Sequence, residues 1–196
     1  VSDATLLEII DMKMSSHADF IHRKRAELCG PLTEAVNEYY RRLSGGGESV
    51  SIRYRSDIDK APLEQLLKES LERDRIMKYT TVGVQRDDFI FDMDGYPIRR
   101  CGSQGQQKSF LLALKLAQFD LMRKAFGFAP ILLLDDVFDK LDMNRTRNLL
   151  EMVSSEDFGQ IFITDSNKVR LASLVDGLSD DRAFFETVGG VFTRTE

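Results

Sequence analysis

Three short stretches between residues 102 and 142 contain the side chains best suited to chemistry. The first, Gly102–Lys108 (GSQGQQK), is a small polar loop in front of a helical pattern. The second, Ile131–Asp136 (ILLLDD), is an apolar run that ends in two carboxylates, and the third, Asp139–Asp142 (DKLD), is an acidic loop. A serine-glycine turn, a buried strand that ends in acid and an acidic loop are together suited to a nucleotide triphosphate and its metal ion.

The polar loop could bind phosphate because it opens a helix. The first turn of a helix has free backbone N–H groups and the positive end of the helix dipole, and both attract an anion. Gly105 lets the backbone approach a ligand closely, and the Ser103 hydroxyl can donate to a phosphate oxygen. By itself this pattern is weak, because serine and glycine also cap many helices that bind nothing.

The apolar run predicts a strand that is buried on both faces of a parallel sheet. Ligands of such sheets bind at the carboxyl ends of the strands, where Asp135 and Asp136 would lie. Mg²⁺ prefers oxygen ligands and keeps several waters, so Asp135 is the candidate metal ligand. Asp136 is the candidate catalytic residue, which would orient or deprotonate an attacking water.

Two other classes of function fit parts of this pattern. A metal-dependent nuclease or phosphatase could use Asp135, Asp136 and Asp142, but it would need further acidic or histidine ligands around them. That hypothesis leaves the loop at Ser103 without a role. A non-enzymatic interaction module is the third possibility for this chain.

Length and composition indicate a globular chain with one large domain or two small ones. The 196 residues are 42% hydrophobic and 30% charged, with a net charge of −5. This charge argues against a wholly basic nucleic-acid binder but allows a local basic face. No apolar run approaches the roughly 20 residues needed to span a bilayer. Two cysteines without a Cys-x-x-Cys pair fit a reduced cytoplasmic protein.

The elements that must position the three stretches divide at about residue 80. Residues 1–80 predict a mostly helical arm lobe, in which Gly30-Pro31 separates a helix over 5–28 from one over 32–43. A strand over 50–54 and a helix that starts at Pro62 complete this lobe. Residues 81–196 predict an α/β unit with a parallel sheet and flanking helices. Its elements are a hairpin at Asp94-Gly95, a helix over 106–126 that is apolar nearly all round, strands over 131–134 and 160–164, a helix capped near Asp142, and a hairpin at Gly189-Gly190.

Basic residues recur in the helical lobe, and Arg23, Lys24 and Arg25 are consecutive among them. Two interpretations stay open for these cations. They belong either to a solvated face mixed with glutamates or to a surface that contacts the phosphates of duplex DNA. Arg86, beside Asp87 and Asp88, is similarly ambiguous. It forms a structural ion pair at the lobe boundary, or it helps to position the nucleotide.

Taken together, the three stretches resemble the signature loop, the Walker B strand and the D-loop of ABC-type ATPase heads. Within that superfamily, Gly102–Lys108, Ala113–Gln118 and Leu134–Phe138 are most similar to the RecF family, and Gly83–Asp88 (GVQRDD) also resembles a segment of it. The resemblance covers nearly the whole chain but only the back part of the family's length. Other SMC-like or RecN-like heads are close alternatives.

The resemblance implies a slow ATPase of DNA replication, repair, recombination and the SOS response, in which two cytoplasmic subunits dimerise around ATP and Mg²⁺. The implied nucleotide contacts are Ser103, Gln104, Gly105, Gln106 and Asp142. The implied partners are double-stranded DNA at gap junctions, contacted by Arg23, Lys24 and Arg25, and the proteins RecO and RecR, with which such ATPases load recombinase. The sequence has no Gly-x-x-x-x-Gly-Lys-Ser/Thr loop, so we expect the C-terminal portion of a longer protein, inactive by itself.

Two positions depart from the usual ABC pattern. Asp136 stands where these ATPases usually have glutamate, and its shorter side chain would place water less well, which fits slow hydrolysis. Thr164 and Asp165 stand near the position of a histidine that senses the terminal phosphate in many of them. Either residue is a weak candidate for that role.

Overall fold

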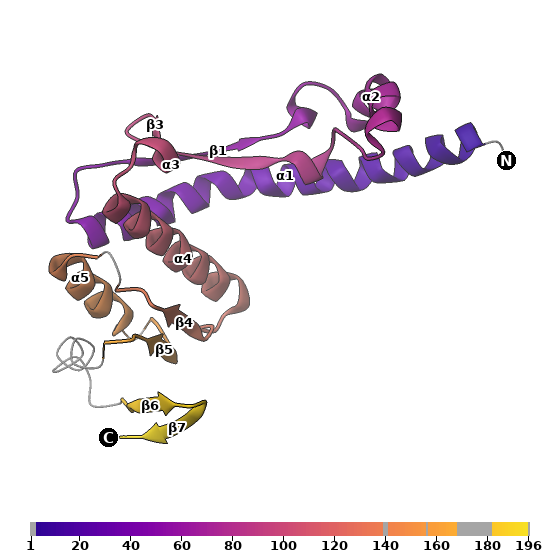
Figure 1. Cartoon of the computed structure of the whole chain (residues 1–196). Coiled ribbons are helices and arrows are strands. Elements are labelled where there is room, and N and C mark those ends of the chain that lie inside the picture. Colours follow the sequence, from indigo (N-terminus) through magenta and orange to yellow (C-terminus); the bar gives the residue numbers. More distant parts are fainter. Residues whose placement is uncertain (1–2, 139–140, 156, 168–181, 196) are drawn as a thin grey trace.

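The computed structural model describes residues 3–138, 141–155, 157–167 and 182–195 of the chain. Figure 1 shows one long helix with an antiparallel sheet lying along it. A second long helix crosses near the C-terminal end of the first, and the α/β elements follow beyond it. The structure therefore confirms the mixed α/β class, with helices, an antiparallel sheet and a parallel strand pair.

Helix α1 (Asp3–Ser44) continues through Gly30-Pro31, so the predicted break is wrong. Proline removes only one donor from the helix, and the Thr33 hydroxyl supports the next turn by donating to the carbonyl four residues earlier at 2.7 Å. Side chains beyond the proline are anchored in the main core, and their packing outweighs the lost hydrogen bond. These side chains are Leu32, Val36, Tyr40 and Leu43.

The antiparallel sheet consists of β1 (Val50–Arg55), β2 (Asp88–Met93) and β3 (Tyr96–Pro97), in the order β1-β2-β3. The predicted turn is confirmed, since Asp94 and Gly95 both adopt the positive φ values, 48° and 82°, that a tight hairpin turn needs. A short helix, α3 (Ile98–Cys101), follows β3 and leads into the polar loop.

A small separate core lies at the outer part of α1. Helix α2 (Leu63–Met77) packs there together with the short 3₁₀ helices η1 (Asp57–Asp59) and η2 (Val84–Arg86). The buried residues of this small core are Ala18, Leu63, Leu67 and Val82. This cluster holds the β1–α2 connection against the long helix.

Helix α4 (Gln104–Phe126) packs across α1 and is buried along one face only. Burial of a leucine such as Leu116, which is fully inaccessible, contributes about 1.5–3 kcal/mol. The opposite face is open, with Leu111 49% and Met122 37% exposed. A helix that is apolar nearly all round in sequence predicts burial on every side, and this expectation is wrong here, because the described residues pack against only one side of α4.

The parallel sheet consists of β4 (Leu132–Asp135) and β5 (Ile161–Thr164), paired in register from Leu132 opposite Ile161 to Asp135 opposite Thr164. Burial alternates along β4: Leu132 and Leu134 are buried, whereas Leu133 is 70% exposed. A strand buried on both faces was predicted, but the described part of the chain covers one face of this two-stranded sheet. Helix α5 (Met143–Val153) lies between the two strands in sequence.

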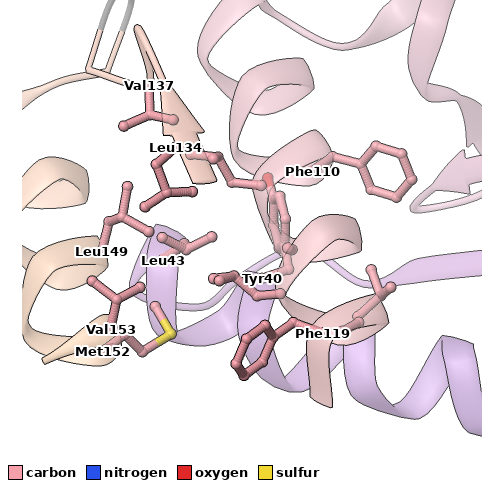
Figure 2. Close-up of a cluster of buried hydrophobic side chains, with 14 of the residues drawn as sticks. Tyr40, Leu43, Phe110, Phe119, Leu134, Val137, Leu149, Met152 and Val153 are labelled. Carbon is pink, nitrogen blue, oxygen red and sulfur yellow. The ribbon is translucent and has the colours of Figure 1, made fainter. Parts of the chain in front are cut away.

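The main hydrophobic core joins α1, α4, β4 and α5 (Figure 2). In this view Leu43 of α1 lies near Leu134 of β4 and Leu149 of α5, whereas the Tyr40 hydroxyl donates to Met93 Sδ of β2 at 3.7 Å. The core thus takes residues from both sides of position 80, and the division into units 1–80 and 81–196 stays a prediction. Packing fixes the start of α4 and the end of β4 in one body.

The last described elements are β6 (Phe185–Val188) and β7 (Val191–Arg194), which form the predicted hairpin around Gly189-Gly190. Among the helices of the described residues, none is sufficiently long and apolar to cross a membrane.

Candidate functional site

The start of α4 is closed by a reciprocal pair of hydrogen bonds. The Gln106 backbone N–H donates to Ser103 Oγ at 3.2 Å, and the Ser103 backbone N–H donates to Gln106 Oε1 at 2.8 Å. Because Ser103 Oγ accepts in this capping box, its own proton stays available to donate to an anion. Ser103 and Gln104 are exposed, so the loop can meet a ligand from outside.

The carboxyl ends of β4 and β5 meet at Asp135 and Thr164. The Thr164 hydroxyl donates a short hydrogen bond to Asp135 Oδ1. Both side chains are exposed at this edge of the sheet. Thr164, one of the two candidates from the sequence, therefore contacts the candidate metal ligand. The other candidate, Asp165, accepts from the Asn167 backbone N–H at 2.6 Å.

Asp136 is held through its backbone and leaves its carboxylate outward. Its φ of 46° lies in the left-handed region, which aspartate tolerates better than most residues. Its N–H donates to the Thr164 carbonyl at 3.2 Å, and Lys108 Nζ donates to the Asp136 carbonyl at 3.3 Å. Among the described residues, no lysine or arginine forms an ion pair with the Asp136 carboxylate. The side chain is therefore available for a ligand.

Lys108, at the end of the polar loop, contacts the end of strand β4. The sequence did not predict this contact. Position 108 follows Gln104 by one helical turn, so both project from the first turns of α4. Only the packing of α4 beside β4 brings the ammonium group to the Asp136 carbonyl. The candidate phosphate loop and the candidate metal ligand consequently lie at the same end of α4 and β4 (Figure 1).

Asp142 caps α5 as predicted. Its Oδ1 accepts from the Arg145 backbone N–H at 2.9 Å, and its Oδ2 lies 3.5 Å from Arg145 Nε. Asp139 and Lys140, the first half of the acidic loop, lie outside the described residues. Of the predicted nucleotide contacts, Asp142 thus has a structural partner already.

The donor set fits a single hard cation and not a metal cluster. Mg²⁺ is commonly bound by one or two carboxylates with several waters, and exposed Asp135, with the Thr164 hydroxyl beside it, offers this chemistry. Within the described ranges, no group of three or more histidine, cysteine, aspartate or glutamate side chains is arranged to hold a metal. The alternative of a nuclease or phosphatase built on several converging acids gains no support from these residues.

The three consecutive cations of α1 each contact an acid. Lys24 Nζ lies 2.7 Å from Glu27, and Arg23 Nε lies 4.0 Å from the same carboxylate. Arg25 Nη1 lies 3.0 Å from Asp87 and donates to the Val84 carbonyl at 2.6 Å. Arg23 and Lys24 stay exposed, whereas Arg25 is part of the packing between α1 and η2.

Asp87 has a structural role, and its partner is not the neighbouring Arg86. Its side chain is 1% exposed and pairs with Arg25, and the Tyr54 hydroxyl donates to it as well. Asp88 pairs with Arg55 across the β1–β2 ladder at 3.4 Å. The structure therefore shows structural ion pairs in this segment, but Arg25 and Arg55 supply the positive charges. The role of Arg86, which the sequence left open between an ion pair and nucleotide positioning, is not assigned by these contacts.

The fold and the motif order define the class as part of an ATPase head of the ABC and SMC type. A solved structure of an SMC ATPase matches 89% of the chain with a TM-score of 0.53 at 15% identity, which shows the fold alone. No protein-family model matches the chain.

Sequence relatives then give the particular family. The chain is 42% identical over 188 residues to the DNA replication and repair protein RecF of Parabacteroides distasonis, and 42% identical over 173 residues to that of Flavobacterium johnsoniae. These alignments cover 96% and 88% of the chain, but 52% and 48% of the relatives. A solved structure of the recombination mediator protein RecF with ATP, from the RecFOR pathway, matches all of the chain and 52% of its own, with a TM-score of 0.78 at 29% identity.

The chain therefore belongs with the RecF proteins over the part of their length that it spans. It spans about half the length of the curated relatives that it matches.

Proposed function

We propose that this chain is part of a RecF-like ATPase of DNA replication and repair, which dimerises on ATP in the cytoplasm. It binds double-stranded DNA at gap junctions and acts with RecO and RecR in loading recombinase. The observation that carries this proposal is the capped, exposed start of α4 beside Asp136, whose carboxylate is exposed and forms no ion pair with another described residue. It stands in a chain that shares 42% of its residues with RecF over almost its whole length.

The loop Ser103–Gln106 contacts the terminal phosphate of ATP held by a second subunit. Ser103 donates through its free hydroxyl proton, and the Gly105 N–H and the α4 dipole add to the attraction. Gln104 is exposed at the same turn, whereas Gln106 supports the cap and donates to Glu48 at 2.9 Å. These contacts form only when two subunits meet, so ATP is bound between the subunits and holds the dimer together.

Asp135 and Asp136 have different roles in the same subunit's own site. Asp135 holds Mg²⁺, with Thr164 orienting its carboxylate by a hydrogen bond. The cation, when bound, neutralises negative charge on the phosphates. Asp136 orients or deprotonates the attacking water, because its carboxylate carries no competing ion pair among the described residues. Asp142 completes the nucleotide side from the start of α5.

The experiment that tests this proposal measures dimerisation of the complete protein with ATP and Mg²⁺ by light scattering. Ser103→Asp keeps the helix cap, since aspartate is an equally good capping residue, but it places a carboxylate against the incoming phosphate. We expect its ATP-held dimer to be at least about tenfold weaker, because like charges oppose each other at the interface.

Ser103→Asn is the matched control, since it also caps the helix and stays neutral. It should dimerise far better than Ser103→Asp, and all proteins should bind ATP as monomers in calorimetry. A Ser103→Asp protein that dimerises like the wild type would remove the loop from the subunit interface.

A further inference from the structure

A guanidinium group occupies the space beside the glycine of the polar loop. A Cβ atom built on Gly105 would lie 2.5 Å from Arg145 Nη1 and 3.8 Å from its Cζ, which is closer than a real side chain permits. Gly105 is the second residue of α4, and its φ does not lie in the left-handed region. A Cβ at this position would therefore displace the Arg145 guanidinium, so the absence of a side chain at Gly105 is what lets Arg145 contact the loop.

Arg145 is held in this position from α5. Its backbone N–H and its Nε group both face the Asp142 carboxylate, at 2.9 Å and 3.5 Å, and its side chain is only 20% exposed. Asn148, almost one turn further along α5, donates to the Leu43 carbonyl at 3.2 Å and ties the helix to the end of α1. Arg145 is thus held on α5 while its guanidinium contacts the start of α4.

We propose that Arg145 is a positioning residue for the loop Ser103–Gln106 in ATP-dependent dimerisation. Its guanidinium supports the loop from behind and adds positive charge next to the start of α4, where the terminal phosphate is expected. Arg145 also connects the loop to Asp142, so the start of α5 and the loop are positioned together. This inference rests on the proposed function of the loop.

The test is a double-mutant cycle in the complete protein, with ATP-dependent dimerisation as the readout. Gly105→Ala introduces the Cβ that displaces the far end of a flexible side chain, so the fold should be retained while the guanidinium leaves the loop. Arg145→Gln removes the charge but keeps most of the stem. Each single variant should weaken the dimer by about tenfold, and the double variant should be no weaker than either one, because both remove the same contact.

Three controls separate this role from a general loss of structure. Arg147→Ala removes an exposed arginine from the same helix and should leave dimerisation unchanged. ATP binding by the monomer and the thermal midpoint should be nearly the same in all variants. Arg145→Lys, which restores a positive charge without the planar fork, should recover part of the dimerisation.

Each outcome decides the inference. Normal dimerisation of Arg145→Gln, or losses that multiply to about a hundredfold in the double variant, would overturn it while leaving the proposed function intact. A wild-type protein that fails to dimerise with ATP would overturn the proposed function and this inference together.

Discussion

Aspartates occur in two settings in this fold, along the β2 strand and at the carboxyl end of β4. In β2 and the residue before it, Asp87, Asp88 and Asp92 each pair with an arginine of α1 or β1. At the end of β4, Asp135 accepts from the Thr164 hydroxyl, and among the described residues neither Asp135 nor Asp136 forms an ion pair.

The difference separates structural acids from acids available to a ligand. Asp87 and Asp92 are almost fully inaccessible, and a buried carboxylate requires a partner to remain charged. Asp135 and Asp136 are exposed, and water or a cation can satisfy them. Sequence spacing alone gives both groups the same appearance, since each contains two adjacent aspartates.

The largest expected effect follows from Asp136. Asp136→Asn in the complete protein removes the charge and basicity of the side chain but keeps its size. We expect ATP to bind while hydrolysis falls by about a hundredfold or more, as is typical when a general base is lost, and the ATP-held dimer should accumulate. Phosphate release and light scattering measure the two effects. Unchanged hydrolysis would place Asp136 with the structural acids.

The next largest effect tests the structural side. Asp87→Ala leaves Arg25 and the Tyr54 hydroxyl without their shared acceptor, and we expect it to lower the free energy of unfolding by about 2 kcal/mol. Asp88→Ala is the matched control, because the Asp88–Arg55 pair is solvent-exposed on both sides and should contribute under about 1 kcal/mol. Urea unfolding measures both. Equal losses would show that burial does not distinguish the two neighbours.

A smaller effect concerns the cations of α1. Replacing Arg23 and Lys24 with alanine should flatten the plot of log DNA affinity against log salt by up to about 1.8, since each phosphate contact contributes about 0.9. Arg25→Ala should instead lower stability and change this slope less, because Arg25 is already engaged by Asp87. The affinity of each variant for duplex DNA, measured at several salt concentrations, tests this expectation. A slope that only Arg25 changes would reverse these assignments.

The smallest expected effect concerns the stability that Asp120, in the second half of α4, contributes to the fold. Burial opposes the charge of Asp120, but hydrogen bonds from Lys124 and Arg123 outweigh it and hold the pKa of this carboxyl below its ordinary value. A carboxyl with a lowered pKa in the folded state stabilises the fold above its unfolded pKa of about 3.9, and the contribution is lost as the pH falls through the folded value.

Unfolding midpoints in urea between pH 7 and about pH 2 test this expectation, because the contribution is lost only below the unfolded pKa of about 3.9. Asp120→Asn should make stability less dependent on pH across the acid limb than it is in the wild type. Asp157→Asn, which removes an exposed partner of Arg123, should change the acid limb less. An acid limb that Asp120→Asn leaves as steep as before would contradict the pairing.

The sequence by itself determined the elements whose signals are local. The capping box at Ser103 and Gln106, the Asp94-Gly95 turn and the apolar run before Asp135 depend on neighbours within a few residues. The order of strand, helix and strand after residue 130 was sufficient to predict a parallel pair with carboxylates at its carboxyl end. The motif residues could therefore be named before their geometry was known.

Tertiary structure decided everything that depends on contacts between distant residues. Pro31 remains inside α1 because Val36 and Tyr40 are buried in a core built largely by α4 and α5, and a local rule cannot include that packing energy. Thr164, Lys108 and Arg145 reach the site only because β5, α4 and α5 are placed beside β4 and the polar loop. The sequence named Thr164 as a candidate and Lys108 as part of the polar loop, but it gave no sign of the contacts that these side chains and Arg145 make. Those contacts exist only because packing brings the elements within a few ångströms of one another.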